Sequence, residues 1–179
     1  GNLGINRTVV GATSLFYACA TLSGNFTYSD NTGSSAVMGN PGIKTSIGGI
    51  INITANFSTP AVFEMHRLVN QTPGGSITVT NSLGFTLQLD TLLVSFLNIT
   101  GYRGNNYARL FNNKITGNIT IADDMSYTGG FGTFIRNNTI TGNSSFFVNG
   151  SNNFYEADIA GSGNNYTGNV DFNSTGAPL

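Results

Sequence analysis

Short segments of the chain alternate apolar and polar residues, and each one follows a glycine. After Gly117, for example, Ile119 and Ile121 are apolar and Thr120 between them is polar. This period of two predicts strands with one face against a core. We expect the inward positions to stack as one core: Phe26, Tyr28, Ile51, Ile53, Ile77, Val79, Ile119, Ile121, Phe146, Val170 and Phe172.

The glycines that precede these segments recur at a fixed period. They are Gly24, Gly49, Gly75, Gly117, Gly142 and Gly168, at intervals of 25, 26, 42, 25 and 26 residues. The interval of 42 predicts two turns of about 21 residues, with a degenerate copy near Phe96–Ile99. Such a period is the signature of a repeat architecture, in which each unit buries its apolar face only against its neighbours.

A second apolar phrase precedes the glycine in many turns, as in Ala61-Val62-Phe63-Glu64 and Gly132-Thr133-Phe134-Ile135. Asparagine pairs such as Asn112-Asn113 and Asn137-Asn138 mark the corners, where an amide can bond its own turn or stack on the turn above. No segment shows helical periodicity with caps. The sequence therefore predicts an all-β, single-domain parallel β-helix (β-solenoid) of about seven turns, with a period of about 21–26 residues and little or no α-helix.

Residues 112–118 and 136–143 resemble the right-handed parallel β-helix repeat, whose superfamily includes pectate-lyase-like enzymes, surface proteins and phage tailspikes. The resemblance covers residues 12–175, with 1–11 as an N-terminal strand or arm and 176–179 as a tail. It implies the fold and leaves activity open, because this fold hosts many functions. It also implies a helix over one end in secreted enzymes, for which the sequence offers no candidate. We therefore expect the ends to be covered by other copies or by chain outside this fragment.

Composition narrows the classes of partner. Charged residues make up 8% of the chain and the net charge is −1, so no basic patch favours nucleic acid. No run approaches the ~20 apolar residues of a membrane span. The chain begins at Gly1 and not Met, so we expect a processed or excised product. Cys19 is the single cysteine and is expected to be buried, with an intermolecular disulfide as the alternative.

Three groups of acidic residues are candidates for chemistry, each with a plainer interpretation. Glu64 and His66 share a strand face and could do acid/base work, or form an ion pair on a solvated face. Asp123-Asp124 could bind Ca²⁺ or lie in a polar loop. Glu156 and Asp158 could act as paired glycosidase carboxylates, but nothing indicates a partner subsite. No catalytic residue, metal ligand or cofactor is therefore assigned.

Twelve Asn-x-Ser/Thr sequons occur, where chance pairing of 25 Asn with 38 Ser and Thr gives about five. Strand alternation explains some of them but not the excess. N-glycosylation of an exported protein remains one interpretation. The candidates are Asn6, Asn25, Asn52, Asn56, Asn70, Asn98, Asn118, Asn137, Asn143, Asn149, Asn165 and Asn173.

Three functions compete on this sequence. The first is an extracellular structural protein, a subunit of a surface filament or layer that assembles through open β-helix ends or the N-terminal strand. The second is part of a trimeric viral or phage tail spike that recognises host-surface glycans. The third is a polysaccharide lyase or hydrolase, which the scarcity of charged residues disfavours. The partners expected are copies of the chain itself, as homopolymer or homotrimer, and surface glycans.

Overall fold

The computed structural model describes residues 1–11, 13–16, 21–57, 61–80, 84–88, 94–102, 108–111, 113–123, 133–149, 154–156 and 163–175. All secondary-structure elements within these residues are strands. Each strand pairs in parallel with the equivalent strand of the next coil, so the chain winds as a β-solenoid. The all-β fold and the parallel solenoid predicted from the sequence are confirmed.

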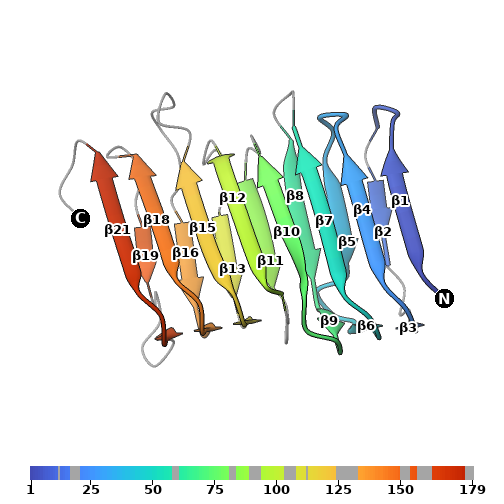
Figure 1. The fold of residues 1–179 in the computed structure, drawn as a ribbon. Coiled ribbons are helices and arrows are strands. Elements are labelled where there is room, and N and C mark those ends of the chain that lie inside the picture. Colours follow the sequence, from blue (N-terminus) through green and yellow to red (C-terminus); the bar gives the residue numbers. More distant parts are fainter. Residues whose placement is uncertain are drawn as a thin grey trace.

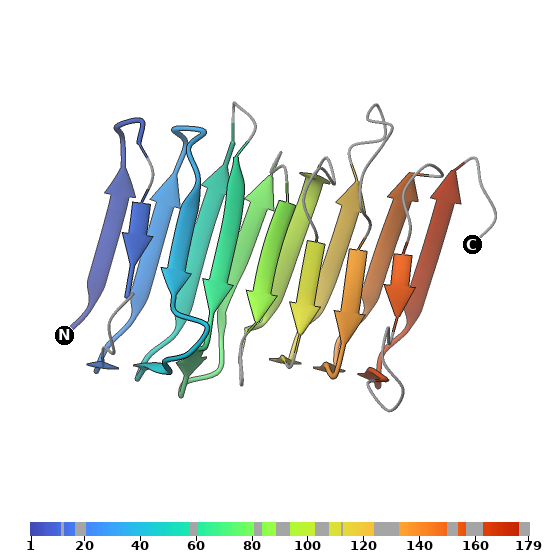
Figure 2. The ribbon, with the colours of Figure 1, turned by 180° about the vertical axis from the view of Figure 1, so that it is seen from behind.

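Two long sheets form two sides of the coil (Figures 1 and 2). The first sheet has eight strands, in the order β1 (Leu3–Arg7), β4 (Phe26–Asp30), β7 (Ile51–Asn56), β10 (Gly75–Thr80), β12 (Phe96–Tyr102), β15 (Asn118–Asp123), β18 (Ser144–Asn149) and β21 (Val170–Thr175). The second has seven, in the order β19 (Phe154–Glu156), β16 (Thr133–Arg136), β13 (Ala108–Phe111), β11 (Gly84–Gln88), β8 (Val62–His66), β5 (Ala36–Gly39) and β2 (Thr13–Leu15).

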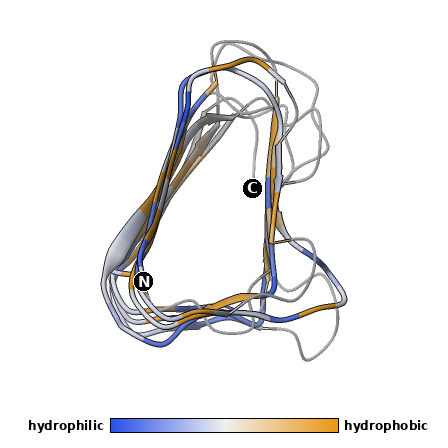
Figure 3. Ribbon diagram, turned by 90° about the vertical axis from the view of Figure 1, so that its right-hand side faces the viewer, coloured by the Kyte–Doolittle hydropathy of each residue, from blue (hydrophilic) through white to orange (hydrophobic). Residues whose placement is uncertain are grey.

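Shorter strands form the third side and close the triangular section seen in Figure 3. One group is β3 (Thr21–Leu22), β6 (Thr45–Ile47) and β9 (Leu68–Asn70), and the other is β14 (Lys114–Ile115), β17 (Thr139–Ile140) and β20 (Asn165–Tyr166). Seen from the N-terminal end, as in Figure 3, the chain rises along the eight-stranded sheet on the left and descends along the seven-stranded sheet on the right. It therefore turns clockwise while it moves away from the viewer. The coil is therefore right-handed (Figures 1 and 3).

The interval of 42 residues contains one further coil, as predicted. Strand β12 pairs with β10 on one side and with β15 on the other. The residue of β12 that pairs with Ile77 and Ile119 is Leu97, which is fully buried. The degenerate copy lacks the glycine phrase but keeps its inward apolar residues, and these are what the stacked core requires.

The register of the coils differs from the alignment of the six glycines. That alignment pairs Ile51 with Ile77, whereas the structure pairs Ile51 with Gly75 and Ile53 with Ile77. The pairing of β7 with β10 is therefore shifted by two residues from the alignment of the glycines. A shift of two keeps every inward side chain inward, because strand side chains alternate with a period of two.

The glycines consequently occupy two columns. Gly49 lies on Gly24, and its amide donates to the Gly24 carbonyl at 3.0 Å. Gly117, Gly142 and Gly168 lie in the second column, where a Cβ would collide with the backbone of the preceding coil. Close backbone approach therefore requires glycine at these positions.

The inward residues of the sheets form one continuous apolar core. Among the expected core residues, those from Phe26 to Phe146 in the list above are at most 2% exposed. Val170 and Phe172 differ, since each is 38% exposed on β21, the last strand of its sheet. They point inward in register with Ser144 and Phe146, but no described coil covers them.

Leu3–Arg7, within residues 1–11, form strand β1. Strand β1 pairs with β4 through five register positions, from Leu3 with Phe26 to Arg7 with Asp30. It is thus the first strand of the eight-stranded sheet. The other edge of β1 lies at the N-terminal end of the solenoid, so this strand forms the edge of the eight-stranded sheet at that end.

Candidate functional site

Glu64 and His66 lie together on β8, as the sequence predicted. Nε2 of His66 is 3.1 Å from Oε2 of Glu64, with His66 8% exposed and Glu64 half-buried. The strands on either side place Val37 and Thr86 beside Glu64, and neither is titratable. The register therefore brings no second acid or base to this pair, and the contact is that of a local ion pair or hydrogen bond.

The other two acidic candidates fall largely outside the described residues. Asp123 and Glu156 end β15 and β19, but their side chains are not described, and Asp124 and Asp158 lie outside the described ranges altogether. Cys19 is outside them as well. Within the residues that the structure describes, no group of three or more His, Cys, Asp or Glu could hold a metal ion. No helix in that same part of the chain is long and apolar enough to cross a membrane.

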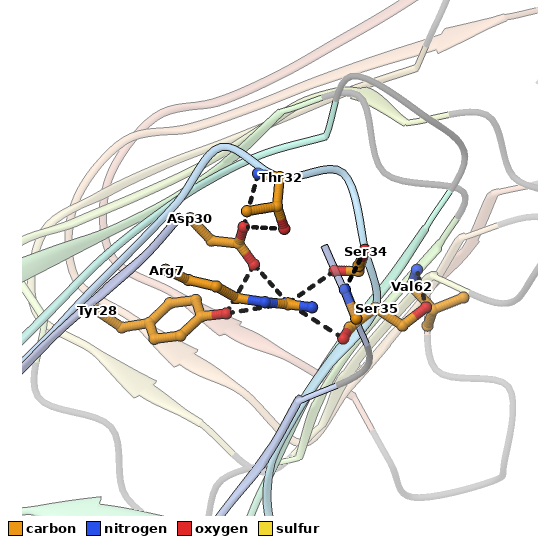
Figure 4. A network of polar contacts seen from close by, with 8 residues as sticks. Arg7, Tyr28, Asp30, Thr32, Ser34, Ser35 and Val62 are labelled. Carbon is orange, nitrogen blue, oxygen red and sulfur yellow. Dashed lines mark hydrogen bonds and ion pairs between the residues drawn. The ribbon is translucent and has the colours of Figure 1, made fainter. Parts of the chain in front are cut away.

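A buried charged cluster lies at the N-terminal end, where the sequence analysis assigned none. Nη1 of Arg7 donates to Oδ2 of Asp30 at 2.8 Å and to the carbonyls of Ser34 and Ser35 at 3.1 and 3.3 Å (Figure 4). The Tyr28 hydroxyl donates to the same Asp30 oxygen at 2.7 Å. The cluster therefore ties β1 and β4 to the segment that enters β5.

The signal for this cluster was present in the strand alternation. Arg7 follows the inward residues Leu3 and Ile5 at the same spacing, and Asp30 follows Phe26 and Tyr28. Both charges therefore point inward, and their side chains are 7% and 0% exposed. Sequence reasoning missed them because it did not establish that β1 pairs with β4 in the register that joins Arg7 to Asp30.

The environment of the cluster shifts two ionisations. Burial, followed by the hydrogen bond to Asp30, raises the pKa of Tyr28 from 10.0 to about 12. Burial alone would raise the pKa of Asp30, but hydrogen bonds from Thr32 and Tyr28 and the charge of Arg7 outweigh it. The pKa of Asp30 therefore lies below its usual 3.8. The two pKa shifts favour a protonated, neutral Tyr28 beside an ionised Asp30.

Asparagine side chains bridge successive coils where strands of the eight-stranded sheet begin. In each case Oδ1 accepts the backbone N–H of the next coil. The bonds are Asn25 N to Asn2 Oδ1 (2.9 Å), Ile50 N to Asn25 Oδ1 (3.1 Å), Ser76 N to Asn52 Oδ1 (3.0 Å), Asn143 N to Asn118 Oδ1 (2.9 Å) and Asn169 N to Asn143 Oδ1 (3.1 Å).

A second amide ladder fills a corner between the other two sides of the coil. Oδ1 of Asn138 accepts the Asn113 backbone N–H at 3.0 Å, and Oδ1 of Asn164 accepts that of Asn138 at 3.0 Å. Asn113 and Asn138 are 3% and 1% exposed, so their amides replace the water that such corners would otherwise need. The stacking expected of the corner asparagines is present here.

The sequon asparagines differ in access. Eight are exposed: Asn6, Asn25, Asn56, Asn118, Asn137, Asn143, Asn165 and Asn173. Asn52 and Asn98 are half-buried, and the side chain of Asn149 is not described. Asn70 is 1% exposed and its Nδ2 donates to the Thr72 carbonyl at 2.8 Å, so we omit it from the acceptors of a glycan. An N-glycan attaches through Nδ2 and leaves Oδ1 able to accept, so ladder asparagines such as Asn25 stay in the set.

The two ends of the solenoid present unpaired strand edges. Within the described residues, β1 pairs only with β4 and β21 only with β18 in the eight-stranded sheet. At the C-terminal end the Phe172 ring stacks on Phe146 at 4.9 Å between centroids and is 38% exposed. An unpaired edge beside exposed apolar side chains is a template for a further strand.

Comparisons of the chain with protein-family models, curated proteins and solved structures return no match.

Proposed function

We propose that the protein is an extracellular structural subunit that assembles into a filament or layer by stacking the ends of its β-solenoid. The coils already associate inside the chain through the same edges that the ends present. A head-to-tail contact that does not close on itself propagates into a fibre. No added binding site is needed for this kind of assembly.

One observation carries the proposal. Val170 and Phe172 continue buried rows of the core but are each 38% exposed on β21. Covering them with another coil would remove apolar area from water at about 25 cal/mol per Å² and would pair the free edge of β21. A second copy supplies a strand to cover β21, because within the described residues the outer edge of its own first strand, β1, is unpaired.

The outer surface supports an exported protein. Apart from Phe96, Ala122 and Phe147, the described residues that project outward from the strands of the eight-stranded sheet are polar or glycine, such as Thr54, Thr78 and Thr120. Exposed sequons such as Asn6 and Asn118 lie on this face. Sugar on these asparagines would keep a surface with so few charges soluble.

The tail-spike alternative stays open to experiment. A trimer of parallel solenoids requires an apolar stripe along one outer side. Among the described residues of the eight-stranded sheet, Phe96 is the large apolar side chain that is both outward and exposed. The enzyme alternative depends on Glu64 and His66, for which the register supplies no third group.

Electron microscopy of the chain, with intact mass on the same sample, tests the proposal. Long uniform filaments with a mass above the 18.8 kDa polypeptide are expected. Phe172→Ser should shorten or abolish the filaments, while Thr120→Ser on the outer face should leave them unchanged. Monomers or closed trimers at every concentration would refute assembly through the ends, and an unmodified mass of native material would refute glycosylation.

A further inference from the structure

We infer that two copies meet in one particular register, with Gly168-Asn169-Val170 of one copy stacked on Gly1-Asn2-Leu3 of the next. This inference rests on the proposed end-to-end assembly and names the contact that produces it. Oδ1 of Asn169 accepts the backbone N–H of Asn2 of the second copy. Val170 then lies on Leu3, and Phe172 on Ile5.

The bond between the copies repeats one that the chain already makes. Asn118 and Asn143 each use Oδ1 to accept the backbone N–H of the asparagine one coil later. Asn169 is the next member of this row, and within the described residues its own Oδ1 accepts no hydrogen bond. At the other end, the backbone N–H of Asn2 donates to no described residue. A hydrogen bond from the Asn2 backbone N–H to Asn169 Oδ1 would therefore repeat the bonds that Asn118 and Asn143 accept inside the chain.

Both ends carry the same phrase. Residues 1–5 are Gly-Asn-Leu-Gly-Ile and residues 168–172 are Gly-Asn-Val-Asp-Phe, so both read Gly-Asn-apolar-x-apolar. Residues 24–28, Gly-Asn-Phe-Thr-Tyr, match this phrase and lie on residues 1–5 in register, with Leu3 on Phe26. Inside the chain, one Gly-Asn-apolar-x-apolar segment therefore already stacks on another in this register.

A second register, shifted by two residues, is the competing geometry, because the chain itself makes such a shift between β7 and β10, where Ile53 lies on Ile77 and Ile51 on Gly75. The same shift between copies would place Phe172 on Leu3 and Val170 on Gly1, which has no side chain. The phrase register instead covers Val170 with Leu3 and Phe172 with Ile5, and Leu3 and Ile5 are both partly buried against the core. It therefore buries more apolar surface on both copies.

Cysteine pairs distinguish the two registers. In a Cys19→Ala background, the phrase register places Asp171→Cys opposite Gly4→Cys, and the shifted register places Asp171→Cys opposite Asn2→Cys. All three positions are exposed, and a Cβ at Gly4 meets no atom within 4 Å. Opposed residues of paired strands are about 4.8 Å apart, within disulfide range, whereas a two-residue offset exceeds the limit of about 7 Å.

Oxidised 4/171 protein should run as a reducible ladder of dimers and higher oligomers, and 2/171 protein as monomer. Residues 2 and 4 lie at the opposite end of the solenoid from residue 171, so every crosslink joins two copies (Figure 1). A ladder from 2/171 alone would overturn the phrase register. Failure of both pairs, while the Cys19→Ala parent still forms filaments, would overturn this contact and leave the proposed function standing. Failure of both with a monomeric parent would overturn both.

Asn169→Ala provides an independent measurement. It removes the acceptor offered to the next copy and keeps the backbone N–H that Asn143 accepts. We expect the critical concentration for assembly to rise by about fivefold, the effect of one hydrogen bond, with thermal stability of the monomer unchanged. Asn143→Ala, which breaks an internal bond of the same kind, should lower monomer stability instead. An unchanged critical concentration for Asn169→Ala would overturn the proposed bond.

Discussion

The two ends of the solenoid use the same inward row of the eight-stranded sheet in opposite ways. The row runs from Arg7 and Asp30 at the N-terminal end to Phe146 and Phe172 at the C-terminal end. Between them the register places Ala55, Val79, Ile99 and Ile121, all buried or nearly so. One row therefore begins as a buried ion pair and ends as an exposed aromatic stack.

This difference shows what each kind of residue needs from a stacked coil. Asp30 accepts hydrogen bonds from Arg7, Tyr28 and Thr32, so the carboxylate of the N-terminal pair is bonded within the first coils. Phe172 stacks on Phe146 and is 38% exposed, so a strand beyond β21 would bury it further. The row is therefore buried at its charged N-terminal end and exposed at its aromatic C-terminal end.

The largest effect on stability is expected from placing a charge in the apolar core midway between the two ends of the solenoid. Ile119 is 1% exposed, between Leu97 and Ser144 in register. Ile119→Asp should cost more than about 4 kcal/mol and abolish folding, because it buries an unpaired carboxylate. Circular dichroism and urea unfolding measure this, with the outward Thr120→Asp as control. A stable Ile119→Asp protein would refute the inward register.

Breaking the N-terminal pair should have the next largest effect. Asp30→Ala leaves Arg7 charged and buried, and we expect a loss of about 3 kcal/mol in the free energy of unfolding of this end. The double variant Arg7→Met/Asp30→Leu should recover most of it, because apolar residues can replace a buried pair. Urea unfolding, with limited proteolysis to locate the opened coil, measures both. Equal stability of the single and double variants would contradict a coupled pair.

The same end should weaken in alkali. The folded pKa of Tyr28, about 12, exceeds the unfolded value near 10, so its contribution is complete below pH 10 and is lost as pH rises toward 12. Unfolding free energies measured from pH 9 to pH 12 should fall over this window. Tyr28→Phe should flatten the fall. A fall of the same size in Tyr28→Phe would assign it to other tyrosines.

Asp30 predicts a separate loss in acid. Its folded pKa lies below the usual 3.8, so its contribution is complete above that value and is lost as pH falls through the folded pKa. Unfolding measured from pH 5 downward should show this loss in the native chain. The Arg7→Met/Asp30→Leu variant removes the group and should show a smaller loss over the same range.

A smaller effect of opposite sign is expected near the C-terminal end. Ser144 is 1% exposed in an otherwise apolar row, and within the described residues its Oγ has no hydrogen-bond partner. Ser144→Ala should raise the free energy of unfolding by about 1 kcal/mol, because it removes a buried unpaired hydroxyl. Thermal unfolding measures this, with the half-buried outward Ser145→Ala as control. Destabilisation by Ser144→Ala would show that the hydroxyl is bonded.

The sequence by itself determined the strands, their inward faces and the degenerate coil around Phe96–Ile99, which lacks the glycine phrase. Alternation with a period of two and a repeated glycine are local properties, so they can be read without knowing which residues meet. The candidate acid/base pair Glu64–His66 was readable for the same reason, since two residues of one strand share a face. The mutual contact of Glu64 and His66 followed from that spacing.

Only the tertiary structure decided the register and what it brings together. A shift of two residues preserves the inward pattern, so the sequence could not distinguish Ile77 on Ile51 from Ile77 on Ile53. In the same way, the register of β1 and β4 joins Arg7 to Asp30 across 23 positions. Periodicity is set within a strand, whereas register is set by the close approach of backbones between coils, which depends on glycines and asparagine bridges acting together.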